Sequence, residues 1–456
     1  MARTADGVDA QPSDEAGAPA GRGHIGLIVL SSIVVGLGLG LILDLLVFDG
    51  SRETVITGLA LLSCAAGCAM LAVLSTRRTD QPQEWAWVSA AAFGIAGAAI
   101  LVAGPSNHVL RLLGWVWPIL LLLLVASMLR GSRRSLHSWS RRAVLYPACV
   151  VLALVAVGGV FETVAEATSS NSAPSGQVYR VNGHSLYLSC VGTRAPTVVL
   201  FNGFQERTPS WAWVQQRVAL EARVCTFDRA GEGWSGPAPG RQDSHQLAAD
   251  LHALLATAHL PGPYVLAGHS VGGTYALDFA QQYPAQVAGV ALIDSSTPYQ
   301  FALPGYSSFY STWRRFSALL PSMARAGLAH LTSRLEFAGL PSQARSSARA
   351  FASNPRELRA DRNEFAELPT AFKQAQALTT FNGKPLVVLT ADRGQGTGWF
   401  AAQDKLALLS TNAVHRTTHG ATHIALLEDQ KFAAVTSAAI RDVVRSVRTT
   451  TPLLLP

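Results

Sequence analysis

Apolar residues fill five long stretches in the first third of the chain, and few charged residues interrupt them. The stretches cover residues 25–43, 55–74, 85–103, 112–129 and 143–161, and each is 18 to 20 residues long. Because an α-helix rises 1.5 Å per residue, about 20 apolar residues cross a hydrocarbon core of about 30 Å. A cleavable signal peptide has a single, shorter apolar region. The pattern therefore predicts a retained, all-α membrane region of five helices over residues 25–166, after a polar tail at 1–24.

Arginines in the short loops predict which way this membrane region lies. If the five helices alternate across the bilayer, nine arginines share the side of the N-terminus: Arg3, Arg22, Arg77, Arg78, Arg130, Arg133, Arg134, Arg141 and Arg142. Only Arg52 and Arg111 lie on the other side. Because cytoplasmic loops carry the excess of Lys and Arg, we expect the N-terminus in the cytoplasm. The chain after residue 161 is then extracytoplasmic, and the protein is expected to be a multi-pass protein of the cell membrane.

Beyond residue 166 the apolar runs become short. Residues 167–177, rich in Ser, Asn and Gly, have the composition of a linker, and Asn182-Gly183 is a strong hairpin signal. Apolar runs then alternate with helical patterns at 197–201, 223–227, 264–267, 287–293 and 385–390. Continuous apolar strands separated by helices indicate a mostly parallel sheet that is covered on both faces. We expect an α/β domain over 178–448, with a helical lid insertion at 295–382 and a tail at 449–456.

One motif in this domain carries candidate chemistry. Residues 268–272 form a G-x-S-x-G sequence directly after the run 264–267, and a helical pattern follows. Such a motif holds its serine on a sharp strand-to-helix turn, clear of the sheet. Ser270 is therefore the candidate nucleophile.

A serine hydroxyl becomes a good nucleophile only when a base takes its proton and an acid orients that base. His423, which lies after the run 385–390, is the candidate base, whereas His419 is expected at a strand end or in a loop. Two carboxylates could orient His423. Asp392 follows the run 385–390 and is preferred over Asp294, which follows the run 287–293.

Acyl transfer also needs N–H groups that stabilise the oxyanion formed on the substrate. The segment 202–204 follows the run 197–201, as an oxyanion loop would. We expect the N–H of Phe204 to act there together with the N–H of Val271, the residue after the candidate nucleophile.

Together these elements resemble the α/β-hydrolase superfamily, of the lidded esterase and lipase-like kind, over about residues 177–448. The resemblance rests on segment 202–204, on the G-x-S-x-G sequence, on His423 with Glu428, and on residues 228–235, which are similar to the family's D-R-x-G-x-G-x-S loop. Asn202 departs from the pattern, since relatives commonly have His before the glycine. The serine nucleophile argues against the epoxide and haloalkane reactions of relatives that use an aspartate.

The family's strand order places the strands of Cys190 and Cys225 side by side. The resemblance therefore implies a disulfide between these two residues, because it would persist outside the cytoplasm. It also implies chemistry that needs no cofactor and no metal. The sequence has no H-E-x-x-H, phosphate-loop or dinucleotide-binding motif in the context that such sites require.

The net charge of the protein adds little to this prediction. The formal net charge is +7 and the pI about 9.4, but the charges are scattered singly, which argues against a nucleic-acid partner. We expect a membrane-anchored, outward-facing serine hydrolase whose partners are the lipid bilayer and a small-molecule or lipidic ester. A peptidase, lactonase or thioesterase would use the same triad. A catalytically silent binding or sensory module is the alternative, and a transporter is disfavoured because the apolar stretches contain no central charge.

Overall fold

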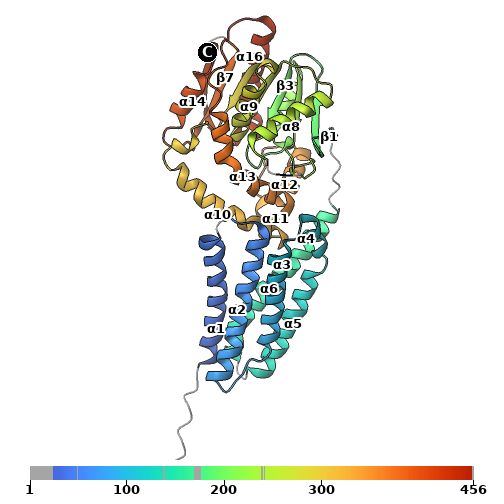
Figure 1. Ribbon diagram of the computed structural model, residues 1–456, viewed down its shortest axis with the longest axis vertical. Helices are drawn as coiled ribbons and strands as arrows, with labels where there is room; N and C mark the ends of the chain where they lie inside the picture. Colours follow the sequence, from blue (N-terminus) through green and yellow to red (C-terminus); the bar gives the residue numbers. More distant parts are fainter. Residues whose placement is uncertain are drawn as a thin grey trace, which may run out of the picture.

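The computed structural model describes residues 24–48, 50–136, 139–168, 176–237, 240 and 242–453. Most of the predicted polar tail, including Arg3 and Arg22, lies outside these residues, as do 169–175 of the predicted linker and 454–456 of the predicted tail. The helices of the first third stand at one end of the molecule and the sheet at the other, with a helical layer between them (Figure 1).

Among the described residues up to 168, six α-helices form the N-terminal region. They are α1 (Ile25–Ile42), which continues as a π-helical turn over Leu43–Val47, α2 (Glu53–Arg78), α3 (Ala86–Ala103), α4 (Asn107–Leu113), α5 (Trp117–Ser135) and α6 (Trp139–Thr168). Four of them are long and apolar enough to cross a membrane, and α4 with α5 adds a fifth if that pair, bent by 46°, counts as one span. The span predicted at 112–129 begins in α4 and continues in α5 after the bend.

The C-terminal domain is built on one sheet of eight strands in the order β1-β2-β4-β3-β5-β6-β7-β8. Its strands are β1 (Gln177–Val181), β2 (His184–Val191), β3 (Thr197–Phe201), β4 (Arg223–Phe227), β5 (Tyr264–His269), β6 (Val287–Ile293), β7 (Leu386–Arg393) and β8 (Ala413–Thr422). β1 and β2 pair antiparallel through the predicted hairpin, where Asn182 and Gly183 both have positive φ, and the strands from β3 to β8 pair in parallel. The expected mostly parallel α/β sheet is confirmed.

Helices cover both faces of the sheet, which explains why its strands read as continuous apolar runs. On one face α8 (Ser244–Thr257) and α9 (Val271–Gln282) pack on Val199, Leu266 and Val388. On the other face α7 (Ala212–Val218) and α16 (Gln430–Thr449) pack on Val198, Val265 and Val387. Neighbouring residues of one strand point to opposite faces, so both kinds of position must be apolar.

The cysteines of the domain lie on this sheet. Cys190 in β2 and Cys225 in β4 occupy facing positions of neighbouring antiparallel strands. The structure joins them by a disulfide.

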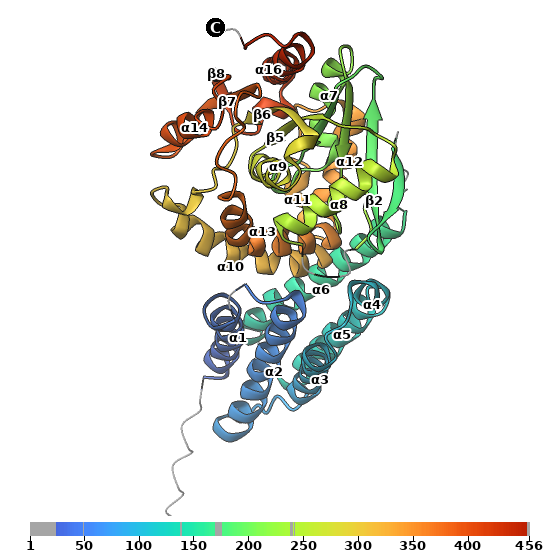
Figure 2. The same cartoon turned by 45° about the horizontal axis from the view of Figure 1, so that its top comes forward.

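Helices α10 (Tyr306–Arg325), α11 (Ala329–Ser333), α12 (Ser342–Ser353) and α13 (Pro355–Ala375) form the insertion between β6 and β7. We call these four helices the cap. The cap lies between the sheet and the ends of the N-terminal helices in both views (Figures 1 and 2).

Ion pairs and hydrogen bonds fasten the cap to the N-terminal helices. Glu53, the buried first residue of α2, pairs with Arg325 of α10 and Arg359 of α13. Glu162 of α6 pairs with His330 of α11 at 2.6 Å. The cap thus contacts both the N-terminal helices and the loops after β3 and β4, where Arg207 and Arg229 pair with α13.

Candidate active site

The backbone around Ser270 forms a sharp turn between β5 and α9. Ser270 has φ 54° and ψ −129°, a strained conformation for a residue with a side chain. A Cβ atom on Gly268 would lie 2.5 Å from the Gly273 nitrogen, and one on Gly272 would lie 2.3 Å from the Phe201 oxygen. Glycine is therefore required on both sides of the turn, which leaves the Ser270 side chain at the carboxyl end of β5 and partly exposed.

The candidate base pairs with Asp294. His423 Nδ1 lies 2.6 Å from the Asp294 Oδ2 atom, and Asp294 is fully buried. The carboxylate also accepts hydrogen bonds from Trp399 Nε1 at 2.8 Å, Gln395 Nε2 at 2.9 Å and the Ala391 nitrogen at 3.3 Å. Burial by itself would raise the pKa of Asp294, but the hydrogen bond and charge of His423 and the Trp399 hydrogen bond outweigh it and hold that pKa below its ordinary value.

The structure pairs His423 with Asp294 and not with Asp392, the acid preferred from the sequence. Asp392 lies inside β7, and its carboxylate accepts from His419 Nδ1 at 3.0 Å and from the Gly420 nitrogen at 2.7 Å. Both donors belong to the neighbouring strand β8, so the Asp392 carboxylate is held against β8. Asp294, in contrast, sits just beyond β6 with φ 42°, a turn that directs its carboxylate toward His423. His419 itself lies within β8 and not in a loop.

The candidate oxyanion loop packs against the start of α9. A Cβ atom on Gly272 would lie 2.6 Å from the Asn202 oxygen, so the two backbones touch. Arg229 fixes the loop by donating to the Asn202 oxygen at 2.7 Å and the Gly203 oxygen at 3.1 Å. Val271 is the first residue of α9, and the first N–H groups of a helix have no partner within it. Asn202, the departure from the family pattern, donates through its side chain to the Phe227 oxygen at 2.8 Å.

A buried pair of charged groups behind this site was not predicted from the sequence. Glu206 accepts from the Gly203 nitrogen at 2.6 Å and pairs closely with His269 Nδ1. His269 Nε2 lies 3.1 Å from the His423 carbonyl oxygen, and the two imidazole rings are 4.3 Å apart. Glu206 and His269 therefore connect the candidate oxyanion loop to the loop of the candidate base.

Burial and mutual attraction have opposite effects on the pKa values of Glu206 and His269. Burial opposes the charged form of each, but their mutual attraction outweighs it. The pKa of His269 is consequently raised and the pKa of Glu206 lowered, so the pairing favours the charged form of each group. The only sequence signal for this pair is the position of His269 inside the G-x-S-x-G sequence.

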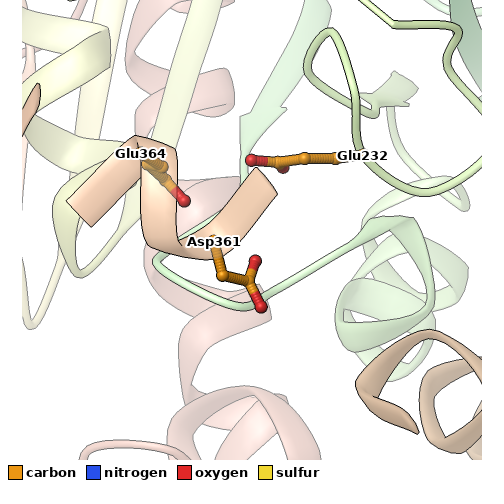
Figure 3. Close-up of side chains that lie close together, drawn as sticks. All are labelled: Glu232, Asp361 and Glu364. Atoms are coloured by element: carbon orange, nitrogen blue, oxygen red, sulfur yellow. The ribbon is translucent and has the colours of Figure 1, made fainter. Parts of the chain in front are cut away.

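A cluster of carboxylates lies where the cap meets the rest of the domain. Glu232 comes from the loop after β4, whereas Asp361 and Glu364 come from α13, and one oxygen of each lies within 4.8 Å of the others (Figure 3). Such a group could hold a cation, but Arg207 already pairs with Asp361 at 2.5 Å and Arg229 with Glu364 at 2.8 Å. We therefore interpret the cluster as ion pairs that fasten α13 to the domain below.

Burial raises the pKa of two of these acids. The pKa of Glu364 is raised to about 8 and that of Asp361 to about 6. In Glu364 the cost of burial therefore outweighs the attraction of the Arg229 charge.

Comparison with known proteins agrees with this architecture. The family model described as alpha/beta hydrolase fold matches residues 196–430. The Cif epoxide hydrolase of Acinetobacter nosocomialis has a similar structure, with a TM-score of 0.53 and 15% sequence identity, over 64% of this chain and 96% of that one. At this identity the likeness concerns the fold alone.

Curated relatives match shorter segments. A pimeloyl-[acyl-carrier protein] methyl ester esterase of Chromobacterium violaceum is 33% identical over 112 residues, which are 25% of this chain and 41% of that protein. The dihydrolipoyllysine-residue acetyltransferase component of the acetoin cleaving system of Pseudomonas putida is 34% identical over 142 residues, 30% of this chain and 37% of that protein. In both cases the chain spans less than half of the relative's length. The family model covers more than half of this chain, and the protein is a member of the α/β-hydrolase fold family.

Proposed function

We propose that this hydrolase is a serine hydrolase anchored in a membrane, which cleaves an ester-type bond through an acyl-enzyme on Ser270. The observation that carries the proposal is the 2.6 Å contact between His423 and the buried Asp294, beside the strained turn of Ser270. Activity on esters is also supported by the ester hydrolase among the relatives.

The proposed mechanism follows from the hydrogen bonds of His423. Because Nδ1 donates to Asp294, Nε2 is the nitrogen that takes the proton from the Ser270 hydroxyl. The serine oxygen then attacks the ester carbonyl, and the N–H groups of Val271 and Phe204 stabilise the oxyanion. His423 returns the proton to the leaving alcohol. A water molecule, deprotonated by His423, then attacks the acyl carbon, and as the acid leaves His423 returns the proton to the Ser270 oxygen.

The proposed location has the N-terminus in the cytoplasm and the catalytic domain outside it. The apolar helices support a membrane location, and the arginines of the short loops support this orientation. A membrane-impermeant maleimide tests it in intact cells. We expect label on a Leu408→Cys variant, whose position is 82% exposed, and no label on the Arg77→Cys variant.

The binding or sensory module remains the alternative function, and covalent labelling decides between the two. A fluorophosphonate probe reacts with an activated serine, so we expect the full-length protein in detergent or nanodiscs to be labelled. Ser270→Ala and His423→Ala should abolish labelling, whereas the matched control His419→Ala should keep it. A folded parent protein that resists the probe would favour the silent module.

A further inference from the structure

We propose that this enzyme takes esters with long apolar chains from the membrane leaflet beside its cap, and that α10 is the helix that contacts this leaflet. The inference rests on the serine hydrolase activity proposed above and specifies its substrate class as lipidic esters. Three features carry it: the place of α10, an exposed apolar stripe along this helix, and a series of aromatic rings.

Helix α10 lies at the ends of the first two membrane helices. Its Ser322 hydroxyl is 2.7 Å from that of Thr57 in α2, and Arg325 pairs with Glu53, where α2 begins. Next to Gly50, in the connection between α1 and α2, lies Arg314 of α10. The views in Figures 1 and 2 agree with this placement. Helix α10 is therefore at the level where the apolar spans end, which is the interfacial region of a bilayer.

An apolar stripe runs along the part of α10 that the protein leaves uncovered. Phe309, Phe316 and Met323 recur every seven residues, so they lie on one side of the helix, and they are 54%, 52% and 42% exposed. Arg314 and Arg325 lie on the side that contacts the membrane helices. A helix with arginines on one side and large apolar residues on the other is typical of segments that lie in a membrane interface.

Neighbouring surfaces favour lipid over a protein partner for this stripe. Helix α10 contacts the π-helical turn that ends the first span. There Leu46 and Val47 are 64% and 58% exposed, as expected of side chains that meet acyl chains. The exposed residues of α10 thus adjoin a surface that is already lipid-facing in the proposed membrane protein.

Aromatic rings connect the stripe to the candidate active site. The ring of Phe204, the candidate oxyanion residue, lies 5.2 Å from that of Phe365 in α13. Phe365 in turn lies 6.4 Å from Phe309 of the stripe and stacks on Tyr310 at 5.0 Å. The rings thus form a continuous apolar series from the stripe to the candidate oxyanion loop, and a long acyl chain would gain apolar contact there that a two-carbon acyl group would not.

Two esters with one leaving group test the proposal on the full-length protein in phosphatidylcholine nanodiscs. They are 4-methylumbelliferyl oleate, placed in the bilayer, and 4-methylumbelliferyl acetate in solution. We expect Phe316→Ser/Met323→Ser to lower the ratio of oleate to acetate turnover at least about tenfold. The matched control, Leu220→Ser/Leu408→Ser, removes residues that are 73% and 82% exposed on the catalytic domain, and should keep the parent ratio. An unchanged ratio in the α10 variant, or an equal loss in the control, overturns the proposal.

Lipid contact has a readout that does not depend on activity. Cys64, Cys68 and Cys149 are replaced by Ala, and an environment-sensitive fluorophore is attached to Phe316→Cys or, as the control, to Leu408→Cys. We expect spin-labelled lipid in the nanodisc to quench the fluorophore at position 316 and not at 408. Equal quenching at both positions overturns lipid contact by α10. A parent protein that the fluorophosphonate probe does not label refutes the proposed activity instead, whatever the quenching shows.

Discussion

Replacing Asp294 by Asn separates the two acids that could orient His423, because the side chain keeps its shape and loses its charge. Asp294 Oδ2 meets His423 Nδ1 and Gln395 Nε2, and Oδ1 meets Trp399 Nε1 and the Ala391 nitrogen. Each oxygen of the carboxylate therefore accepts hydrogen bonds from two donors. Whichever way the new amide turns, its NH2 group faces N–H groups.

The size of the effect follows from this arrangement. If the amide nitrogen faces His423, Nδ1 must become the acceptor, and the proton then sits on Nε2, where it blocks proton transfer from Ser270. If the amide is turned the other way, the buried Trp399 N–H loses its acceptor. His423 then keeps an acceptor, but this acceptor is a neutral amide oxygen in place of a charged carboxylate oxygen. Hydrogen bonds to a charged group contribute about 1.5–3 kcal/mol each, and the wrong tautomer of a triad histidine costs about 10⁴-fold in kcat. We expect kcat to fall about 10³- to 10⁴-fold, which is about 4–5.5 kcal/mol in the activation free energy.

The assay compares three proteins at equal folded concentration. Full-length parent, Asp294→Asn and Asp392→Asn are tested for 4-methylumbelliferyl acetate turnover and for the rate of fluorophosphonate labelling, with thermal unfolding as the control for folding. Asp392→Asn should retain activity within about twofold, because its carboxylate contacts only β8. If Asp294→Asn stays within tenfold of the parent while Asp392→Asn falls further, the assignment of the acid is refuted.

Three further changes test other parts of the structure. Glu206→Gln removes the charge that holds the Gly203 nitrogen and His269, so labelling should slow about 10- to 100-fold without a change in circular dichroism; an unchanged rate would exclude a positioning role. Because burial raises the pKa of Glu364 from about 4.5 to about 8, the folded state binds an extra proton between these values and stability falls as the pH rises through them. Glu364→Gln should therefore flatten the decline of the melting temperature between pH 6 and 9, and an unaltered slope would contradict the assignment. Glu53→Gln weakens the contacts of Arg325 and Arg359 and should speed proteolysis within residues 326–341, whereas equal rates would show that these pairs do not hold the cap.

Much of the fold could be predicted because buried strands appear in the sequence as runs of apolar residues. Strands covered on both faces need apolar residues at every position, and the runs 197–201, 223–227 and 287–293 coincide with β3, β4 and β6. β8 could not be predicted in this way. It lies at the edge of the sheet and carries polar residues such as Thr417 and His419, so no apolar run marks it.

Some residues of the candidate site could likewise be predicted from the sequence, and others could not. Ser270 stands in a motif whose glycines are required by close backbone contacts. The glycines can be read directly from the sequence. The choice between Asp294 and Asp392 could not be made from the sequence, because both follow apolar runs that form neighbouring parallel strands. The difference is one backbone angle: Asp294 turns out of its strand with φ 42°, whereas Asp392 continues in β7. Glu206 was missed for a related reason, since only the folded loop brings it to His269.

The attachment of Glu53 to both Arg325 and Arg359 changes how the N-terminal helices should be regarded. Cutting the chain in the linker would remove the counter-ion of two guanidinium groups at once, and His330 would lose Glu162 as well. The excised domain would then expose Arg325, Arg359 and His330 of the cap to water without these partners. The N-terminal helices therefore stabilise the position of the cap in the tertiary structure, in addition to any role in anchoring the protein.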